Sequence, residues 1–228
     1  MIPHLLLAIE FAAVFVVVPV LVYYRRIPNL PIAYLLAAAL LAFLAVRGDP
    51  TFNRLQLTAW GNFRPFLWGI LIRDAVCLVG LGTGVYLLAP QLLFSLVRRS
   101  PWLWALIFLF YPLVSVYPQE FLYRAFFFHR YQSFFGNGLG MIAASALAFG
   151  FVHIIFRNWL AVGLCVIGGF LFSFTYQESG SLLLACLDHA IFGNFLFTIG
   201  LGSFFYHGFR TGPPSIHSSP QTGLHPLK

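Results

Sequence analysis

The chain has 228 residues, of which 60% are hydrophobic and only 8% are charged, and its mean hydropathy is +0.87. So little charge cannot cover the surface of a soluble domain of this length; the composition is that of a helical membrane protein surrounded by a lipid bilayer. The formal charge of +7 comes from basic residues scattered between apolar runs. They form no basic stripe of the kind that a phosphate backbone needs, so nucleic acid is not expected as a partner.

Long apolar runs separated by turn residues predict an all-α, polytopic membrane helix bundle of about seven transmembrane helices. Residues 1–210 are expected to form a single membrane domain, and residues 211–228, rich in Pro, Ser, Thr and Gly, a disordered tail. The helices are expected at about residues 5–24, 31–46, 66–89, 102–131, 139–156, 159–176 and 181–206. Seven Lys or Arg residues lie on the C-terminal side of the membrane and four on the other, which favours a cytoplasmic C-terminus.

The fourth predicted helix contains two charged residues among apolar and aromatic ones. Glu120 and Arg124 are four residues apart, so their side chains lie on one face of a helix, within reach of each other. Placing either charge in hydrocarbon costs roughly 2.5–3.5 kcal/mol, which indicates a function or a structural tie. Pro112 and Pro118 are expected to kink or divide this helix.

Two histidines fall at a similar depth in other predicted helices. With a rise of about 1.5 Å per residue, Glu120 lies about 16 Å from one face of the membrane, His153 about 21 Å and His189 about 12 Å from the same face. These depths lie within the interior of a hydrocarbon layer about 30 Å thick. We therefore expect three helices to bring Glu120, His153 and His189 together in one buried polar site.

A carboxylate and two imidazoles support two kinds of hydrolytic chemistry. Glu120, His153 and His189 can bind a zinc ion and leave one position open for water. They can also act without a metal, the glutamate activating water while the histidines orient it or stabilise an oxyanion. Arg124 would hold or neutralise Glu120 in either case. The structural alternatives are a Glu–Arg tie, a hydrogen-bonded packing histidine, and an Asp188–His189 pair that links helices.

These residues resemble the motifs of the CPBP family of intramembrane proteases, which includes the CAAX prenyl endopeptidases and bacterial bacteriocin-processing or immunity (Abi) proteins. The family's Glu-Glu-x-x-x-Arg motif is similar to residues 119–124, Gln-Glu-Phe-Leu-Tyr-Arg. Its Phe-x-x-x-His motif is similar to residues 149–153, Phe-Gly-Phe-Val-His. Its third motif, a His followed four residues later by Asn or a similar group, is matched in part by His189. The resemblance covers about residues 102–206.

Two positions depart from the family's pattern. Gln119 stands where the family has its first Glu, which is usually assigned to activating water, so either Glu120 takes over that role or activity is lost. The position four after His189 is Gly193, and the next residue is Asn194. On a straight helix Asn194 lies about 140° round from His189. It reaches the site only if a π-bulge at Gly193 turns the helix.

The resemblance implies an intramembrane endopeptidase that cleaves a membrane-associated peptide or protein near its end, in a prokaryotic plasma membrane. Glu120 would be the general base, His153 and His189 would bind zinc or stabilise the oxyanion, Arg124 would support the site, and Asn194 would complete it. Two alternatives from other classes stay open. One is a catalytically inactive member that serves as a membrane binding or immunity protein, and the other is a small transporter that uses the Glu–Arg pair as a gate.

Overall fold

The structure is a computed structural model that describes residues 4–59 and 63–205, except for the side chains of residues 63 and 64. The predicted tail at 211–228 lies outside the described residues. All regular secondary structure in the described part of the chain is helical, which confirms the all-α prediction.

The described residues contain the apolar helices that a membrane protein requires. Five helical stretches are long and apolar enough to cross a bilayer, and two shorter apolar helices, α3 (Pro31–Val46) and α12 (Leu182–Thr198), accompany them. The five are His4–Tyr23, Pro65–Leu88, Pro101–Arg130, Leu139–Phe156 and Trp159–Ser179. These positions agree with the predicted segments. That all seven cross the bilayer, and that the C-terminus is cytoplasmic, stay predictions.

Each long helical stretch is divided into segments where its hydrogen bonding changes between the α form and the 3₁₀ or π form. Segments of the 3₁₀ and π forms are both labelled η. The first half contains α1 (His4–Ala12), η1 (Ala13–Val17), α2 (Val18–Tyr23), α3, η2 (Arg54–Leu57), α4 (Phe63–Leu88), η3 (Pro90–Leu92), α5 (Ser95–Arg99) and α6 (Pro101–Tyr111). The second half contains η4 (Pro112–Val116), α7 (Tyr117–Glu120), η5 (Phe121–Phe126), α8 (Phe127–Arg130), α9 (Gln132–Phe135), α10 (Leu139–Val152), η6 (His153–Phe156), α11 (Trp159–Ser179), α12 and η7 (Leu201–Phe205).

The fourth predicted helix is continuous from Pro101 to Arg130, so of the two expected effects of its prolines, a kink or a division, the division is not present. Instead, two π-helical segments, η4 and η5, flank the short α7 that carries Glu120. Proline has no N–H, so the preceding turn loses a hydrogen bond and the backbone can widen there. A π turn holds one more residue than an α turn, so it changes the direction of the side chains that follow, and such turns are frequent at functional sites.

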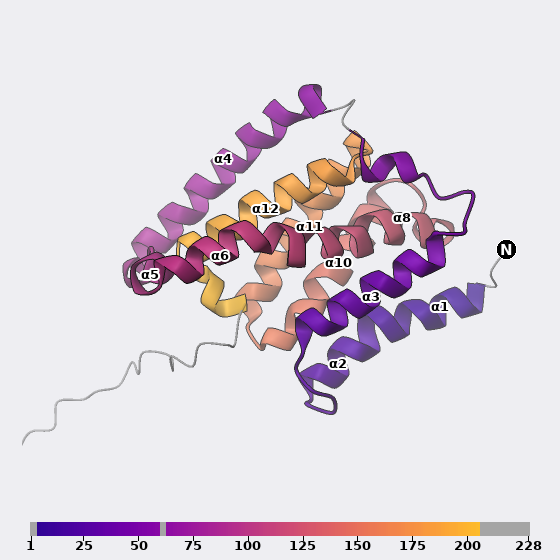
Figure 1. Ribbon diagram of the computed structural model, residues 1–228, viewed down its shortest axis with the longest axis horizontal. Helices are drawn as coiled ribbons and strands as arrows, with labels where there is room; N and C mark the ends of the chain where they lie inside the picture. The colour runs from indigo at the N-terminus through magenta and orange to yellow at the C-terminus, as the bar shows by residue number, and fades with distance from the viewer. Residues whose placement is uncertain (1–3, 60–62, 206–228) are drawn as a thin grey trace, which may run out of the picture.

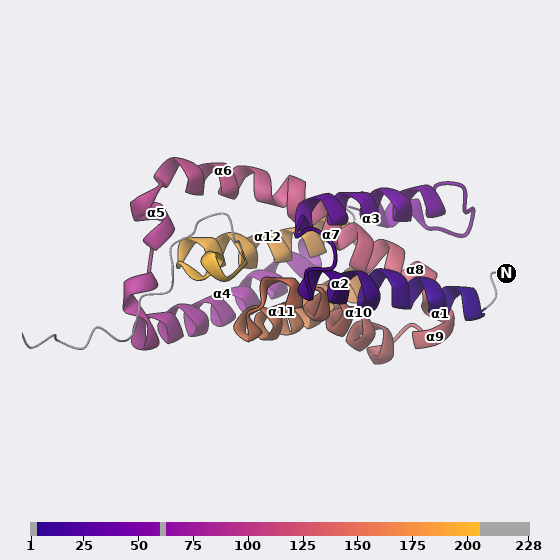
Figure 2. The ribbon, with the colours of Figure 1, turned by 90° about the horizontal axis from the view of Figure 1, so that it is seen from below.

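Figure 1 shows the arrangement of the helices, and Figure 2 labels α7, which packs against α3 and α12. α10 and α11 pack against each other, and a Cβ at residue 169 of α11 would lie only 2.9 Å from the Cα of Ala146. α12 lies against α11 and α4, α3 packs against α7 and η5, and η1 packs against α10. α4 lies at the edge of the bundle and exposes Trp68, Val76 and Val79, as expected of a lipid-facing helix.

A polar network joins α4, α11 and α12. Arg73 forms an ion pair with Asp74 at 2.9 Å, and it also binds Asp188 of α12 at 2.5 Å. Thr175 of α11 donates a hydrogen bond to the same Asp188 carboxylate at 2.6 Å. The proposed Asp188–His189 pair is not formed, because successive residues of a helix point about 100° apart. Asp188 faces α4 and α11, whereas His189 faces α7.

The loop after α3 is tied to the end of α8 at Asp49. The Asp49 carboxylate accepts hydrogen bonds from the Thr51 amide and hydroxyl, at 2.8 and 2.6 Å, and from the His129 ring at 2.9 Å. These donors favour the ionised form and hold the pKa of the Asp49 carboxyl well below its usual range.

Candidate active site

Glu120 and His189, which are 69 residues apart in the sequence, meet in the interior of the bundle. Nδ1 of His189 lies 2.7 Å from Oε1 of Glu120, and the same oxygen lies 3.1 Å from Nη1 of Arg124. Glu120 and Arg124 have no exposed surface and His189 is 5% exposed. The expected convergence of the carboxylate with one imidazole and with the arginine is therefore present.

Arg124 is the only counter-charge in direct contact with Glu120 among the described residues. Its Nη2 donates a hydrogen bond to the Gly169 carbonyl at 3.2 Å. Its guanidinium lies over the ring of Phe149 at 4.7 Å and near that of Phe172 at 5.6 Å, both measured to the ring centroid. The carbonyl and the two aromatic faces compensate in part for the lost hydration of a buried cation.

The hydrogen bonds of His189 fix its tautomer. Glu120, paired with Arg124, can only accept a hydrogen bond, so Nδ1 of His189 carries the hydrogen. With the ring neutral, Nε2 accepts a hydrogen bond from the Tyr111 hydroxyl, whose oxygen lies 3.0 Å away. The ring is held flat against Phe172, with centroids 4.5 Å apart. The result is a carboxylate–imidazole–phenol chain in which the carboxylate orients the imidazole.

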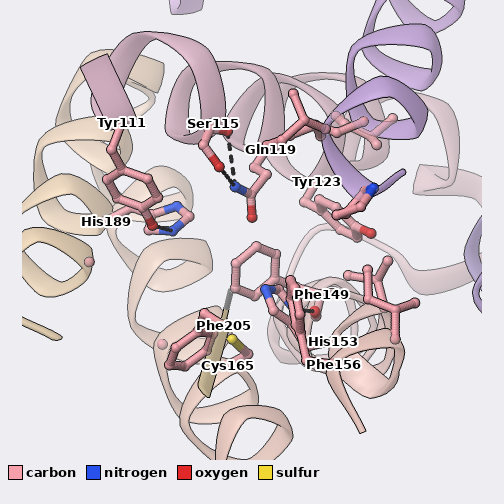
Figure 3. Close-up of a pocket in the computed structure, with 18 of the residues that line it drawn as sticks. Tyr111, Ser115, Gln119, Tyr123, Phe149, His153, Phe156, Cys165, His189 and Phe205 are labelled. Atoms are coloured by element: carbon pink, nitrogen blue, oxygen red, sulfur yellow. Dashed lines mark hydrogen bonds between the residues drawn. The ribbon is translucent and has the colours of Figure 1, made fainter. Parts of the chain in front are cut away.

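The hydrogen-bonded series of Glu120, His189 and Tyr111 ends on the wall of a cavity of about 1460 Å³. The wall is mainly apolar and is formed by residues of α1, α2, α3, α4, α6, α7, α10, α11 and α12 together with the π and 3₁₀ segments between them. Its polar side chains include Tyr111, Ser115, Gln119, His153 and His189 (Figure 3). Glu120 lies behind His189 and takes no part in the wall. A general base that acts on water in the cavity would have to contact the cavity directly, and Glu120 does not.

Gln119 faces the cavity in the place next to the buried glutamate. Its side-chain nitrogen donates hydrogen bonds to the Ser115 carbonyl at 3.0 Å and to the Ser115 hydroxyl at 2.7 Å. Because a carbonyl can only accept, these bonds fix the amide nitrogen on the Ser115 side. The Gln119 oxygen therefore points into the cavity as a neutral acceptor (Figure 3).

His153 lies on the same cavity wall but is not joined to the glutamate. Its Nδ1 donates a hydrogen bond to the Phe149 carbonyl at 2.7 Å, which leaves Nε2 as an acceptor. The ring of Phe149 contacts both histidine rings, with centroids 4.9 Å from His153 and 5.4 Å from His189. The two imidazoles thus share a cavity and an aromatic neighbour, and the expected single cluster of Glu120, His153 and His189 is not formed.

The expected zinc site does not fit this geometry. In the described part of the chain no three His, Cys, Asp or Glu side chains lie close enough together to hold a metal ion. Both ring nitrogens of His189 are already engaged, one by Glu120 and one by Tyr111. We therefore derive no catalytic step that uses a metal.

Asn194 is placed outside the site. α12 remains α-helical through Gly193, so the π-bulge that would have turned Asn194 towards His189 is not formed. The Asn194 amide donates a hydrogen bond to the Phe108 carbonyl at 3.2 Å and ties α12 to α6. Tyr111 was not predicted from the sequence. The polar spacing of Tyr111, Ser115 and Gln119, four residues apart in an apolar segment, was the available signal.

The fold and the site define a polytopic helical membrane protein with a buried Glu–Arg–His set beside a large apolar cavity. The family model described as type II CAAX prenyl endopeptidase Rce1-like matches residues 100–196. This region contains Glu120, Arg124, His153 and His189, so the match confirms the resemblance to the CPBP family and supports a protease at the family level. Neither the curated proteins nor the solved structures that were compared gave a match.

Proposed function

We propose that this protein is an intramembrane endopeptidase that cleaves a membrane-associated peptide, with His189 as general base and Glu120 as the residue that orients it. The family match supports peptide-bond hydrolysis, and the cavity offers room for an apolar part of a substrate. The observation that carries the assignment is the hydrogen-bonded chain from Glu120 through His189 to the cavity wall. We place the protein in a prokaryotic plasma membrane by analogy with the family.

In this proposal Nε2 of His189 removes a proton from a water molecule, whose oxygen attacks the carbonyl carbon of the scissile peptide bond. Glu120 accepts the Nδ1 hydrogen bond throughout, and it stabilises the imidazolium that forms. The imidazolium then gives the proton to the departing amine nitrogen as the C–N bond breaks. One water is consumed, and one carboxylic acid and one amine are produced. Arg124 pairs with Glu120 in these apolar surroundings and holds its side chain in place.

His153 and Gln119 supply acceptors on the same wall. Nε2 of His153 and Oε1 of Gln119 can each accept a hydrogen bond from the attacking water or from a substrate N–H. A water with hydrogens accepted in this way presents its lone pairs to the carbonyl carbon. The apolar lining excludes other water, which strengthens each of these hydrogen bonds.

Cleavage of a tethered reporter peptide by the purified protein in lipid vesicles tests the proposal. His189→Gln and Glu120→Gln should both reduce the cleavage rate, by about 10²-fold or more, because general-base catalysis is worth that much. His129→Gln is a matched control outside the cavity wall, and it should leave the rate within about twofold. Wild-type rates in both site variants would refute the role of the Glu120–His189 pair.

A second function is favoured by one observation, the neutral Gln119 at the cavity-facing position. A silent member that binds a membrane peptide without cutting it would bind the reporter saturably and leave it intact. In that case Gln119→Glu, which places a carboxylate on the cavity wall, should produce cleavage above background. If the wild-type protein cleaves the reporter and His189→Gln does not, the peptidase function is supported over the binding function.

A further inference from the structure

Tyr111 is the side chain that completes the polar wall beside His189. It is the last residue of α6, directly before the π-helical segment that begins at Pro112. Its hydroxyl donates to Nε2 of His189 at 3.0 Å, and its ring contacts those of His189 and Phe197 edge-on, with centroids 6.0 and 5.4 Å apart. The phenol is therefore held in one orientation, with its hydroxyl next to the proposed base.

The position of Tyr111 depends on the absence of a side chain at Gly193. A Cβ at residue 193 would lie 2.6 Å from Cζ of Tyr111 and still closer to Cε1 and the hydroxyl oxygen. The phenol thus fills the space that a side chain one helical turn after His189 would occupy. Tyr111 and Gly193 form a complementary pair, in which the small residue on α12 admits the large polar residue from α6.

We propose that Tyr111 is a further catalytic residue, the hydrogen-bond donor that stabilises the oxyanion during cleavage; this inference rests on the proposed peptidase function. In the structure its hydroxyl covers Nε2 of His189. When a substrate enters, the hydroxyl turns to the peptide carbonyl oxygen and Nε2 becomes free to accept the attacking water. Tyr111 keeps its proton, so it contributes a hydrogen bond and no net transfer.

Tyr111 is the hydroxyl donor that lies directly beside Nε2 of His189, whereas the Ser115 hydroxyl on the same wall lies beside the Gln119 amide, from which it accepts a hydrogen bond. Gln119 uses its amide hydrogens on Ser115, and the neutral rings of His153 and His189 present unprotonated nitrogens to the cavity. A tetrahedral intermediate places negative charge on oxygen and requires a donor. The Tyr111 hydroxyl fills that role.

The first test compares Tyr111→Phe with Tyr131→Phe on the reporter peptide. Tyr131 has no exposed surface and does not line the cavity, and its hydroxyl donates a hydrogen bond to Glu10 at 2.9 Å, so its loss removes a tyrosine hydrogen bond that does not involve His189. Tyr111→Phe should lower kcat by about 10²–10³-fold with KM nearly unchanged, as expected for loss of an oxyanion donor. Tyr131→Phe should leave kcat within about twofold. Cleavage by wild type together with an unchanged kcat for Tyr111→Phe would overturn the inference and leave the proposed function standing.

The second test separates hydrogen bonding from shape. In a Tyr111→Ala background, Gly193→Asn fills the vacated space with a side chain that donates, whereas Gly193→Leu fills it with a side chain of similar size that cannot. The Asn variant should recover at least about tenfold in kcat over Tyr111→Ala, and the Leu variant should not. Equal recovery by both would show that Tyr111 only fills space, and would overturn the inference.

A spectroscopic signature checks the resting contact without any turnover. The ¹⁵N resonance of His189 Nε2 in substrate-free protein should move in Tyr111→Phe towards the value of an imine nitrogen without a hydrogen bond. Tyr131→Phe should leave it in place. An unmoved resonance in Tyr111→Phe would contradict the contact on which the inference depends, and a wild-type protein that cleaves no reporter would remove both the inference and the proposed function.

Discussion

Replacement of Arg124 by methionine removes the counter-charge of Glu120 and keeps most of the apolar stem that packs in the core. Both side chains are without exposed surface and lie 3.1 Å apart. Breaking such a pair by removing one partner costs about 3–5 kcal/mol, mainly because the other charge is left buried and alone. The variant also loses the Gly169 hydrogen bond and the contact with the Phe149 ring.

The double variant Glu120→Gln/Arg124→Met isolates the electrostatic part of this cost. It carries no buried charge at either position, and the Gln carbonyl can still accept the hydrogen bond from Nδ1 of His189. Replacing a buried ion pair by neutral groups of similar volume is often close to neutral. We therefore expect the double variant to recover at least about 2 kcal/mol relative to Arg124→Met, a non-additivity typical of residues in direct contact.

The assay is thermal unfolding of purified protein in one fixed detergent, followed by circular dichroism. A domain of this size shifts its Tm by about 2–4 °C per kcal/mol, so Arg124→Met should lower the Tm by about 6–20 °C. Arg98→Met, at an exposed arginine that binds only the Gln91 carbonyl among its described contacts, should shift it by about 2 °C or less. A double variant no more stable than Arg124→Met would refute the view that Glu120 and Arg124 stabilise each other as a buried pair.

Three further changes test the packing and the polar ties, each by the same unfolding assay. Gly169→Ala should lower the free energy of unfolding by about 1–3 kcal/mol, because its Cβ would press against the backbone of α10. Gly163→Ala, on the same helix but with open space around it, should leave that free energy unchanged or raise it by up to about 1 kcal/mol. Equal Tm shifts in the two variants would contradict the close contact between α10 and α11. Arg73→Leu should cost about 3–5 kcal/mol, because Asp188 and its neighbouring buried aspartate lose the cation between them; a wild-type Tm would show that this network is not needed. The pKa of Asp49 is lower in the folded protein than in the unfolded chain, where it is near 4. The hydrogen bonds to its carboxylate therefore contribute fully to stability above about pH 4, and this contribution is lost as the pH falls towards the pKa of the folded state. Asp49→Asn should therefore reduce the fall in Tm between about pH 6 and about pH 3, and an unchanged fall would exclude this contribution.

Much of the fold could be predicted from local composition. Apolar runs of the right length give the helices, since a segment in hydrocarbon must satisfy its backbone hydrogen bonds internally. The adjacency of Glu120 and Arg124 also follows from helical geometry alone, because residues four apart lie on one face. The response of the helix to Pro112 was less predictable, since a lost hydrogen bond can be absorbed either by a kink or by a π turn.

The direction of each polar side chain could not be predicted in the same way. Gln119 and Glu120 are neighbours, and the packing of η5 and α12 decides which of them faces the cavity and which lies behind His189. The second predicted histidine, His153, lies on the wall of the same cavity as His189, but its Nδ1 binds the Phe149 carbonyl of its own helical stretch and not Glu120. Asn194 was predicted as a site residue only on condition of a π-bulge, which α12 does not form.

The amino-acid sequence by itself determined that this chain is a helical membrane protein, because its few charged residues stand among long apolar runs, and it predicted that a carboxylate, an arginine and two histidines lie within those runs. Only the tertiary structure decided that Glu120 acts on His189, that Gln119 and Tyr111 face the cavity, and that Gly193 makes room for the phenol. The physical reason is that contacts between helices depend on rotation about each helix axis. That rotation is set by close packing at small residues and by π turns, which composition and spacing leave undetermined.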